Sequence, residues 1–352
     1  MAKSHALRFE RVIDQADVAA VVDIEKDRAQ AVVDLLPGAP LVETDYRKIL
    51  HAVDAVLLVL PHHLHHPVSI ECLNAGKHVL VEKPMANSDR ECREMLAAAE
   101  RNQRILMVAY CMRFHPLVRE LQRLVAGKTY GEIFELSIWT EQYTHPPEGH
   151  WIRDQNKLGG GQLFSHGCHY IDLLLWILGR PIRGSHIGTR TGTPWMEREG
   201  TSHVTIEFEG GVLGYHGATW GACGTRLGSS FHAHCTQGML EVDIRRGKLM
   251  LHAGSDIHEP GQHAGQKTTV LMNAPCAKPT DEEMIHFLEC IRTNQKPITD
   301  GVSSLEGLRV IWELYRAEEH HQLADLRGLG LGTFREESGF ERSVESGAEV
   351  TS

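Results

Sequence analysis

The first part of the chain alternates short apolar segments with helical patterns of apolar and polar residues. Apolar segments lie at residues 18–22, 54–60, 78–81 and 105–109, and helical patterns lie between them at residues 69–74 and 89–100. Short segments that are apolar on both faces are typical of buried parallel strands, which crossover helices connect. The pattern therefore predicts an α/β domain with a doubly wound parallel sheet over residues 1–115.

The pattern changes after Pro116. A glycine-rich break at 159–161 precedes a predicted helix at 163–178. Apolar and polar residues then alternate at 201–220 and 229–251. Turn sequences at 209–211 and 246–247 are typical of antiparallel hairpins. Two amphipathic helices are predicted at 281–294 and 303–320, and Asp300-Gly301 is a natural start for the second. We therefore expect an α+β domain over residues 116–325 with a large, mainly antiparallel, open-faced sheet. The residues 326–352 are rich in Gly, Glu and Ser and are predicted to form a flexible tail.

Two elements that normally open a doubly wound, or Rossmann, sheet are missing from the beginning of the sequence. Residues 1–7 already have the pattern of the helix that follows a glycine-rich phosphate loop, and neither the first strand nor a G-x-G-x-x-G loop precedes them. The first strand lies centrally in such a sheet, so its loss would remove hydrogen-bond partners on both sides. We therefore expect that the sequence starts at an internal methionine, about a dozen residues late. The alternative is a chain that never binds a dinucleotide.

The composition excludes several classes of protein. The chain has 352 residues, of which 42% are hydrophobic and 23% charged, as in a globular protein of two domains. It has no apolar run of the ~20 residues that a bilayer-spanning helix needs, and no secretory signal at its start. The eight cysteines include no close pair, so no disulfide framework is indicated. We expect a cytoplasmic protein with no membrane partner, and the net charge of -10 disfavours nucleic acid as a partner.

Asp23 directly follows the first apolar segment. A carboxylate at this place can bind the two ribose hydroxyls of an adenosine, and it would repel the additional phosphate of NADP. Asp23 therefore favours NAD over NADP as the cofactor. The alternative is an ordinary acidic residue at a turn.

Three sequence stretches carry a family resemblance. They are P-H-H-L-H at residues 61–65, A-G-K-H-V-L-V-E-K-P at 75–84, and the glycines 159–161 followed by Ser165, His166, His169 and Asp172. Together they resemble the Gfo/Idh/MocA family, which includes glucose-fructose oxidoreductase and inositol dehydrogenase, and residues 285–292 and 297–301 resemble its closing segment. The resemblance implies an oxidoreductase that transfers a hydride between a nicotinamide dinucleotide and a hydroxyl carbon of a sugar, a sugar derivative or an inositol-like polyol.

Lys83 is a catalytic residue by this resemblance. It leaves the carboxyl end of a predicted strand, where ligands bind in open α/β sheets. A lysine that is partly desolvated beside a cationic ring is suited to hydrogen-bond and polarise the reacting oxygen. The family typically has a cis peptide bond before Pro84. The alternative is a lysine that extends from a strand end into solvent.

His169 is the general acid or base that the resemblance implies. Oxidation of a carbinol requires its O–H proton to leave, and a neutral imidazole is the usual acceptor near pH 7. The family commonly has an acid at the position of Ser165, one helical turn earlier, and this chain lacks it. Either Asp172, three residues after His169, supplies the counter-charge, or His169 works less assisted. A plain salt bridge is the alternative for Asp172.

The resemblance also names residues around the cofactor and the substrate. Cofactor contacts are expected from Asp23, Leu60, Pro61, His65, Glu82, Lys83 and Arg113, and substrate contacts from Arg153, Asp154, Ser165, His166 and His169. Relatives pair through the exposed face of the second domain's sheet, so a homodimer or homotetramer is expected.

Parts of the sequence are also compatible with three other functions. The histidines at 62, 63, 65 and 66, or His166, His169 and Asp172, could hold zinc, but no partner motif such as H-E-x-x-H occurs and we expect no metal. Some relatives use tightly held NAD during glycoside cleavage. Others are non-catalytic, dinucleotide-sensing regulators, which would have lost the lysine or the histidine that this chain keeps.

Overall fold

The parallel strands at the beginning of the chain form two separate sheets. In the computed structural model, which describes residues 1–254 and 267–331, β1 (Ala20–Val22) pairs with β2 (Leu41–Glu43). β3 (Ala55–Leu58), β4 (His78–Glu82) and β5 (Leu106–Ala109) form a three-stranded sheet. Every pairing is parallel, as predicted, but among the described residues no strand joins the two sheets into one.

Burial of these strands follows from their place in the sheets. Four residues of β4 and all four of β5 are buried. In contrast, β1 has no buried residue and β3 has only Leu58. The prediction that all four apolar segments are buried on both faces is therefore wrong for β1 and β3. Each of these strands pairs on one side only, so solvent reaches its free edge.

Both faces of the three-stranded sheet are covered. α3 (His65–Asn74) and α4 (Asp89–Arg101) pack on the face to which Val79 and Val81 point. The opposite face, to which Leu80 points, packs against residues from the two ends of the chain, among them Val12 and Phe287. The latter belongs to α8 (Thr280–Thr293), so a C-terminal helix completes the first domain.

A nine-stranded sheet forms most of the second part of the molecule, in the order β13-β12-β11-β10-β6-β9-β8-β7-β14. Its strands are β6 (Ile133–Glu141), β7 (Pro181–Thr189), β8 (Thr201–Phe208), β9 (Leu213–Thr219), β10 (Ser229–Cys235), β11 (Gly238–Asp243), β12 (Lys248–Ala253), β13 (Lys267–Asn273) and β14 (Ala324–Asp325). Only β6 and β9 pair in parallel, which confirms the mainly antiparallel prediction. Gly210 and Gly247, with φ of 81° and 63°, make the two predicted hairpin turns, where the left-handed backbone favours glycine.

The remaining helices connect or cover these sheets. They are α1 (Ala2–Ala6), α2 (Lys26–Val33), α5 (Pro116–Ala126), α6 (Gln155–Leu158), α7 (Cys168–Leu178) and α9 (Gly301–Glu319), with the π-helical turn η7 (Leu163–Gly167) before α7. Short 3-10 turns are η1 (Phe9–Arg11), η2 (Tyr46–Lys48), η3 (Leu50–Ala52), η4 (His62–Leu64), η5 (Cys111–Phe114), η6 (Trp151–Arg153) and η8 (Glu209–Gly211). Among the described residues, none of the helices has the length and apolar character to pass through a bilayer.

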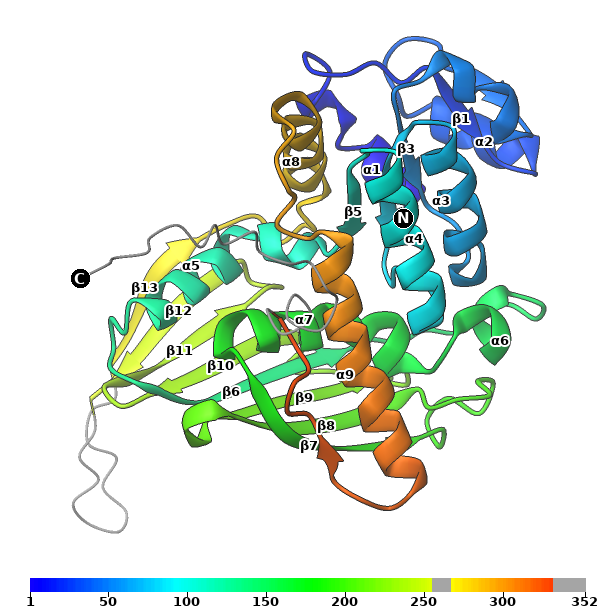
Figure 1. Ribbon diagram of the computed structural model, residues 1–352. Coiled ribbons are helices and arrows are strands. Elements are labelled where there is room, and N and C mark those ends of the chain that lie inside the picture. Colours follow the sequence, from blue (N-terminus) through cyan, green and yellow to red (C-terminus); the bar gives the residue numbers. More distant parts are fainter. Residues whose placement is uncertain (255–266, 332–352) are drawn as a thin grey trace, which may run out of the picture.

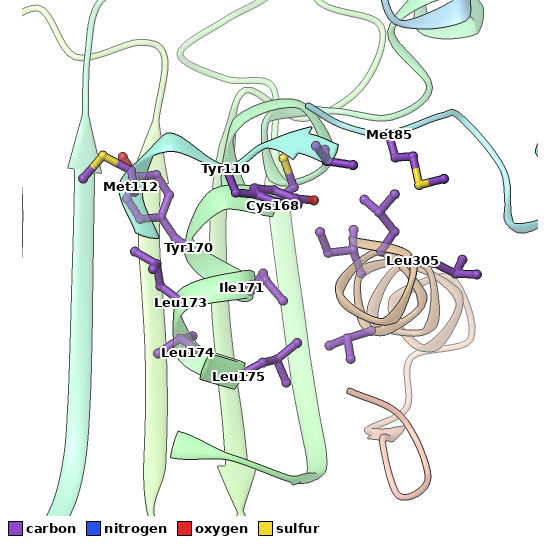
Figure 2. Packing of buried hydrophobic residues seen from close by; sticks show 14 of the residues in the cluster. Met85, Tyr110, Met112, Cys168, Tyr170, Ile171, Leu173, Leu174, Leu175 and Leu305 are labelled. Atoms are coloured by element: carbon purple, nitrogen blue, oxygen red, sulfur yellow. The ribbon is translucent and has the colours of Figure 1, made fainter. Parts of the chain in front are cut away.

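One face of the large sheet is covered by α5, α7 and α9, and no helix of the described residues lies on the other face (Figure 1). Figure 2 shows the apolar side chains of α7, including Ile171 and Leu175, between the sheet and Leu305 of α9. On the uncovered face, Ile187 is 73% and Leu213 46% exposed. The sheet is therefore open-faced, as predicted.

The closing helices α8 and α9 begin and end within two residues of their predicted bounds. The side chain of Asp300 accepts a hydrogen bond from the backbone N–H of Ser303 and caps α9 as predicted. Leu326 is fully buried, and its N–H donates to the carbonyl of Ile182, so the tail cannot be loose as early as residue 326. The rest of the predicted tail, residues 332–352, lies outside the described residues.

Candidate active site

A direct hydrogen bond joins the two domains at the carboxyl end of β4. Lys83 is half-buried, and its Nζ donates to the carbonyl oxygen of Ser165 at 2.6 Å. The expected cis peptide bond lies between Lys83 and Pro84. Ser165 belongs to η7, where the wide π-helical turn replaces the regular hydrogen bonds of an α-helix, a feature that is frequent at functional sites. Lys83 thus lies against the turn that leads to His166 and His169.

His169 is buried close to this contact. Its ring packs edge to face on Tyr110, 5.7 Å between centroids, and 6.2 Å from the ring of His166. Burial lowers the pKa of His169 well below its usual value, and the ammonium groups of Lys83 and Lys278 lower it further. The imidazole is therefore neutral near pH 7. Its Nδ1 is buried and has no hydrogen-bond partner among the described residues, so a ligand could supply one.

Asp172 is bound to Arg113. Its two carboxylate oxygens accept from the guanidinium Nε and Nη2 of Arg113 at 2.7 and 2.6 Å, and Arg113 Nη1 donates to the carbonyl of Ile298. Both side chains are buried, at 1% and 6% exposed. The pair links η5 to α7 beneath the site. This geometry favours a buried structural salt bridge over the roles expected for Asp172, as an assistant of His169, and for Arg113, as a cofactor contact.

Glu82 and Lys83 are consecutive residues, and successive side chains along a strand point to opposite faces of the sheet. The side chain of Glu82 therefore points away from that of Lys83. Its carboxylate is buried and accepts from Nε2 of His5 in α1 at 2.9 Å. Burial alone would raise the pKa of Glu82. The hydrogen bond from His5 and the charge of its ring act in the opposite direction, and the pKa of Glu82 is lowered. Glu82, expected to contact the cofactor, is thus occupied in holding α1 against the sheet.

His65 connects two strand ends. It is fully buried, and its ring nitrogens lie 2.7 Å from the carbonyl oxygen of Pro84 and 2.9 Å from that of Leu60. A neutral imidazole has one N–H, so it donates to one of these carbonyls at a time. His65 fixes the chain around Lys83, and the predicted contacts Leu60 and Pro61 lie at the adjacent strand end.

The remaining predicted residues lie at the edge of the site or away from it. Arg153 donates to the carbonyl of Pro146 at 2.7 and 3.0 Å, and Asp154 caps α6. Asp23 follows β1, in the separate two-stranded sheet, and accepts from the N–H of Glu25 at 2.9 Å. No described contact joins these three to Lys83 or His169. Among the described residues, no group of three His, Cys, Asp or Glu side chains could hold a metal ion.

Two residues that sequence reasoning missed hold the start of the active-site helix. The hydroxyl of Tyr315 accepts from the N–H groups of Gly161 and Phe164 at 3.1 and 3.2 Å, and it donates to Glu199 at 2.6 Å. Glu199 also accepts from the N–H of Leu163. A Cβ on Gly161 would lie 2.1 Å from this carboxylate, so a larger residue there would displace Glu199 from the helix start. No local pattern marks Tyr315 or Glu199, because tertiary folding alone brings them to the helix.

Lys278 is a third missed residue. It lies on the connection between β13 and α8, its side chain is exposed, and its charge acts on both His166 and His169. No sequence motif marks Lys278, because single lysines are common on protein surfaces.

A separate hollow of about 640 Å³ lies at the ends of β7 and α9. It is lined by charged residues, including Arg190, Arg198 and Glu318, and it contains neither Lys83 nor His169. Lys83 and His169 therefore lie outside this hollow.

Comparison with known proteins agrees with this arrangement. Residues 1–110 match the family model described as an oxidoreductase family with an NAD-binding Rossmann fold, and residues 118–241 match the GFO/IDH/MocA C-terminal domain. The chain is 29% identical to inositol 2-dehydrogenase 2 of Saccharopolyspora erythraea over 60% of this chain and 62% of that protein. It is 28% identical to D-xylose 1-dehydrogenase (NADP(+)) 2 of Haloferax volcanii over 86% of this chain and 90% of that one. A solved structure of levoglucosan dehydrogenase with NADH has the same fold, with a TM-score of 0.78, 20% identity, and coverage of 93% and 96%.

Proposed function

The chain belongs to the Gfo/Idh/MocA family of oxidoreductases, and on this basis we propose that it oxidises or reduces a hydroxyl-bearing carbon of a sugar, a sugar derivative or a polyol. The observation that carries the proposal is the hydrogen bond from Lys83 to Ser165, which brings an ammonium group from one domain to the helix of His169 in the other. Relatives named for inositol and for D-xylose support this substrate class.

The residues present fit a nicotinamide dinucleotide at two points. Asp23 directly follows β1, where a carboxylate would bind the adenosine ribose, and Lys83 directly follows β4, where the nicotinamide would lie. When bound, the cofactor supplies the hydride acceptor or donor. Asp23 favours NAD over NADP, because its charge would repel the additional phosphate.

The protein's own groups handle the proton and the oxygen. His169, neutral and with a free Nδ1, takes the hydroxyl proton during oxidation. The Lys83 ammonium, anchored on a neutral carbonyl, keeps its charge available to the oxygen that becomes negative as the proton leaves. His169 is buried and Lys83 half-buried, so their interactions are stronger than in open solvent.

The test is a turnover assay of the purified full chain. It is incubated with NAD and separately with NADP against myo-inositol, D-xylose, D-glucose and their glycosides, and absorbance of the reduced ring is followed. Formation of reduced cofactor with one of these compounds supports the proposal. Release of an aglycone from a glycoside without net reduced cofactor would point to the glycoside-cleaving alternative, and no reaction with any compound contradicts the proposal.

We further propose that the protein is a cytoplasmic homodimer or homotetramer. Its uncovered sheet face carries the exposed Ile187 and Leu213 together with the half-buried Trp139 and Tyr215, and a second copy would shield them. The cysteines of the described residues are all free, which suits a reducing compartment.

A further inference from the structure

His62, the first residue of η4, is a buried histidine that the proposed mechanism does not use. The centroid of its ring lies 5.5 Å from that of His65 and 6.4 Å from that of Phe164. These two rings flank the contact between the domains. Nδ1 of His65 lies 2.7 Å from the carbonyl oxygen of the residue after Lys83, and Phe164 directly precedes Ser165, whose carbonyl accepts from Lys83. His62 therefore lies beside the contact at which the substrate is proposed to bind.

The second domain fixes the orientation of the His62 ring. Its Nδ1 lies 2.9 Å from the carbonyl oxygen of Leu158 in α6. Its ring also packs edge to face on Trp151 of η6, with 4.6 Å between centroids and 62° between the ring planes. Leu158 and Trp151 belong to the short segment that leads to the glycines 159–161. A side chain of the first domain is thus held by the part of the second domain from which the active-site helix starts.

The bond to Leu158 determines which ring nitrogen carries hydrogen. A carbonyl oxygen only accepts, so Nδ1 of His62 must be the donor. Burial lowers the pKa of His62 well below its usual value, and the charge of Lys83 lowers it further, so the ring is neutral near pH 7. Nε2 of His62 is therefore an acceptor with a free lone pair.

This acceptor has no partner in the part of the chain that the structure describes. Polar atoms in such enclosed places are normally hydrogen-bonded, so a bound molecule is expected to supply the donor. His62 is 4% exposed, close to the 3% of His169, so each imidazole presents only a small part of its ring. An unprotonated ring nitrogen accepts from O–H and N–H groups and has nothing to donate to a carboxylate or a phosphate. The hydroxyls of a sugar or polyol are donors of the required kind.

We propose that His62 is a substrate-binding residue whose Nε2 accepts a hydrogen bond from a hydroxyl of the sugar or polyol, at a carbon other than the one that is oxidised. The proposal rests on the function proposed above and deepens it. It makes His62 a specificity-determining residue, because a compound without that hydroxyl would leave the buried Nε2 unpaired.

Two substitutions separate substrate binding from a purely structural role. In His62→Asn the side-chain amide lies near the place of Nδ1, so it can still donate to Leu158 but lacks the acceptor at the place of Nε2. In His62→Gln the amide reaches the place of Nε2, and its oxygen can accept there. We expect KM for the oxidised compound to rise about tenfold in His62→Asn and to change by less than about threefold in His62→Gln. kcat and the dissociation constant of the dinucleotide should stay near the wild-type values in both variants.

His63→Asn is the matched control, because His63 is the exposed neighbour in the same turn. It should keep the wild-type KM. A purely structural role of His62 predicts the opposite order of the two variants, with His62→Asn close to wild type and His62→Gln impaired, since only asparagine can keep the bond to Leu158.

Nuclear magnetic resonance tests the tautomer without turnover. The wild-type chain is isotopically labelled in its histidine nitrogens, and the signals of His62 are identified by their loss in His62→Gln. We expect hydrogen on Nδ1 and none on Nε2 near pH 7. The reduced dinucleotide alone should leave the Nε2 signal in place, and addition of the compound that the turnover assay identifies should then shift it.

The possible results separate the two proposals. If a sugar or polyol is oxidised but His62→Asn keeps the wild-type KM, the proposed function stands and the role of His62 is wrong. Hydrogen on Nε2 of the free protein also overturns this role. If the dinucleotide alone shifts the Nε2 signal, or if His62→Asn weakens dinucleotide binding, His62 binds the cofactor and the inference is wrong. If no compound reacts with the wild-type chain, the proposed function and this inference fail together.

Discussion

Lys83 is held by a neutral carbonyl oxygen, and this determines what it can do. A carboxylate partner would neutralise the ammonium, whereas the Ser165 carbonyl orients it and leaves its charge for a substrate oxygen. His169 is neutral for a complementary reason, since burial and two nearby ammonium groups disfavour its protonated form. In the proposed function the two side chains have opposite tasks, one to stabilise negative charge and one to accept a proton.

The Arg113–Asp172 pair gives the first prediction at this scale. Asp172→Asn should lower the free energy of unfolding by about 3–5 kcal/mol, because the buried guanidinium of Arg113 loses its bidentate partner. The pH profile of kcat should keep its shape, since Asp172 does not serve His169. Urea denaturation and the pH profile measure the two effects.

Asp325→Asn is the matched control for Asp172→Asn. Arg327 also binds Asp325 through two hydrogen bonds, but both side chains are exposed, so little change in stability is expected. A normal stability of Asp172→Asn together with a displaced pH profile would instead support the assistance of His169 that the sequence suggested.

The buried neutral histidines predict how stability depends on pH. Burial lowers the pKa of His216 to about 3, and it lowers the pKa values of His62 and His169 well below the usual range. Below pH ~6.5 the unfolded chain therefore binds more protons than the folded one. The free energy of unfolding should be fully retained above that pH and should fall below it, by about 1.4 kcal/mol per pH unit for each such histidine. Urea denaturation at a series of pH values measures this slope, and a free energy that stays level or rises on acidification contradicts it.

At the residue scale, motifs reveal what lies on one segment and miss what folding brings together. Lys83 and His169 are indicated by the sequence because each stands in a recognisable local motif. The spacing of Asp172 from His169 suggests a partner on the same helix, but Arg113 of η5 binds Asp172 in the folded chain, and no local motif indicates this contact. Lys278 had no local sequence signal.

The active-site helix shows how one element depends on two others. Its first N–H groups are satisfied by the Tyr315 hydroxyl of α9 and by the Glu199 carboxylate before β8, in place of a local cap. The sequence predicts a single helix over 163–178, and the structure divides it into η7 and α7. Periodicity does not distinguish a π-helical turn from an α-helix over one turn, so this detail could not be read from the pattern.

Tyr315→Phe tests this positioning role. The change leaves a buried carboxylate and two buried N–H groups without the hydroxyl, so we expect kcat to fall about tenfold and the dissociation constant of the dinucleotide to stay near its original value. Measurement well below the midpoint of thermal unfolding separates displacement of His169 from loss of folded protein. Tyr46→Phe, which removes an exposed hydroxyl bonded to Glu71, is the control. An unchanged kcat in Tyr315→Phe contradicts the positioning role.

On the scale of the whole molecule, the chain returns to its first domain at the end. The carbonyl of Thr299 accepts from the N–H of Val108 in β5, and α8 packs against the sheet face to which Leu80 points. Figure 1 shows α8 beside β5. The alternating pattern predicted both domains and the closing helices, and the missing central strand agrees with the division of the parallel strands into two sheets. The return of the chain was not predicted, because it depends on which strand edges meet, and this information is not contained in any one segment.

Self-association belongs to this scale as well. Ile187 is 73% exposed on the uncovered sheet face, so Ile187→Glu should convert a dimer or tetramer to smaller species in light scattering. Leu323→Glu, at an exposed leucine between α9 and β14, should not. A monomeric wild-type protein, or an unaltered mass of Ile187→Glu, contradicts pairing through this face.

The most direct test of the account is a double-mutant cycle on Lys83 and His169. The account predicts that Lys83→Ala and His169→Ala each lower kcat by about 10² or more, with the dissociation constant of the dinucleotide much less changed. It further predicts that the double variant loses far less than the product of the two single effects, because both groups act on one carbinol. Turnover at the wild-type rate in either single variant, or fully independent effects, would contradict the claim that the two side chains form one active site.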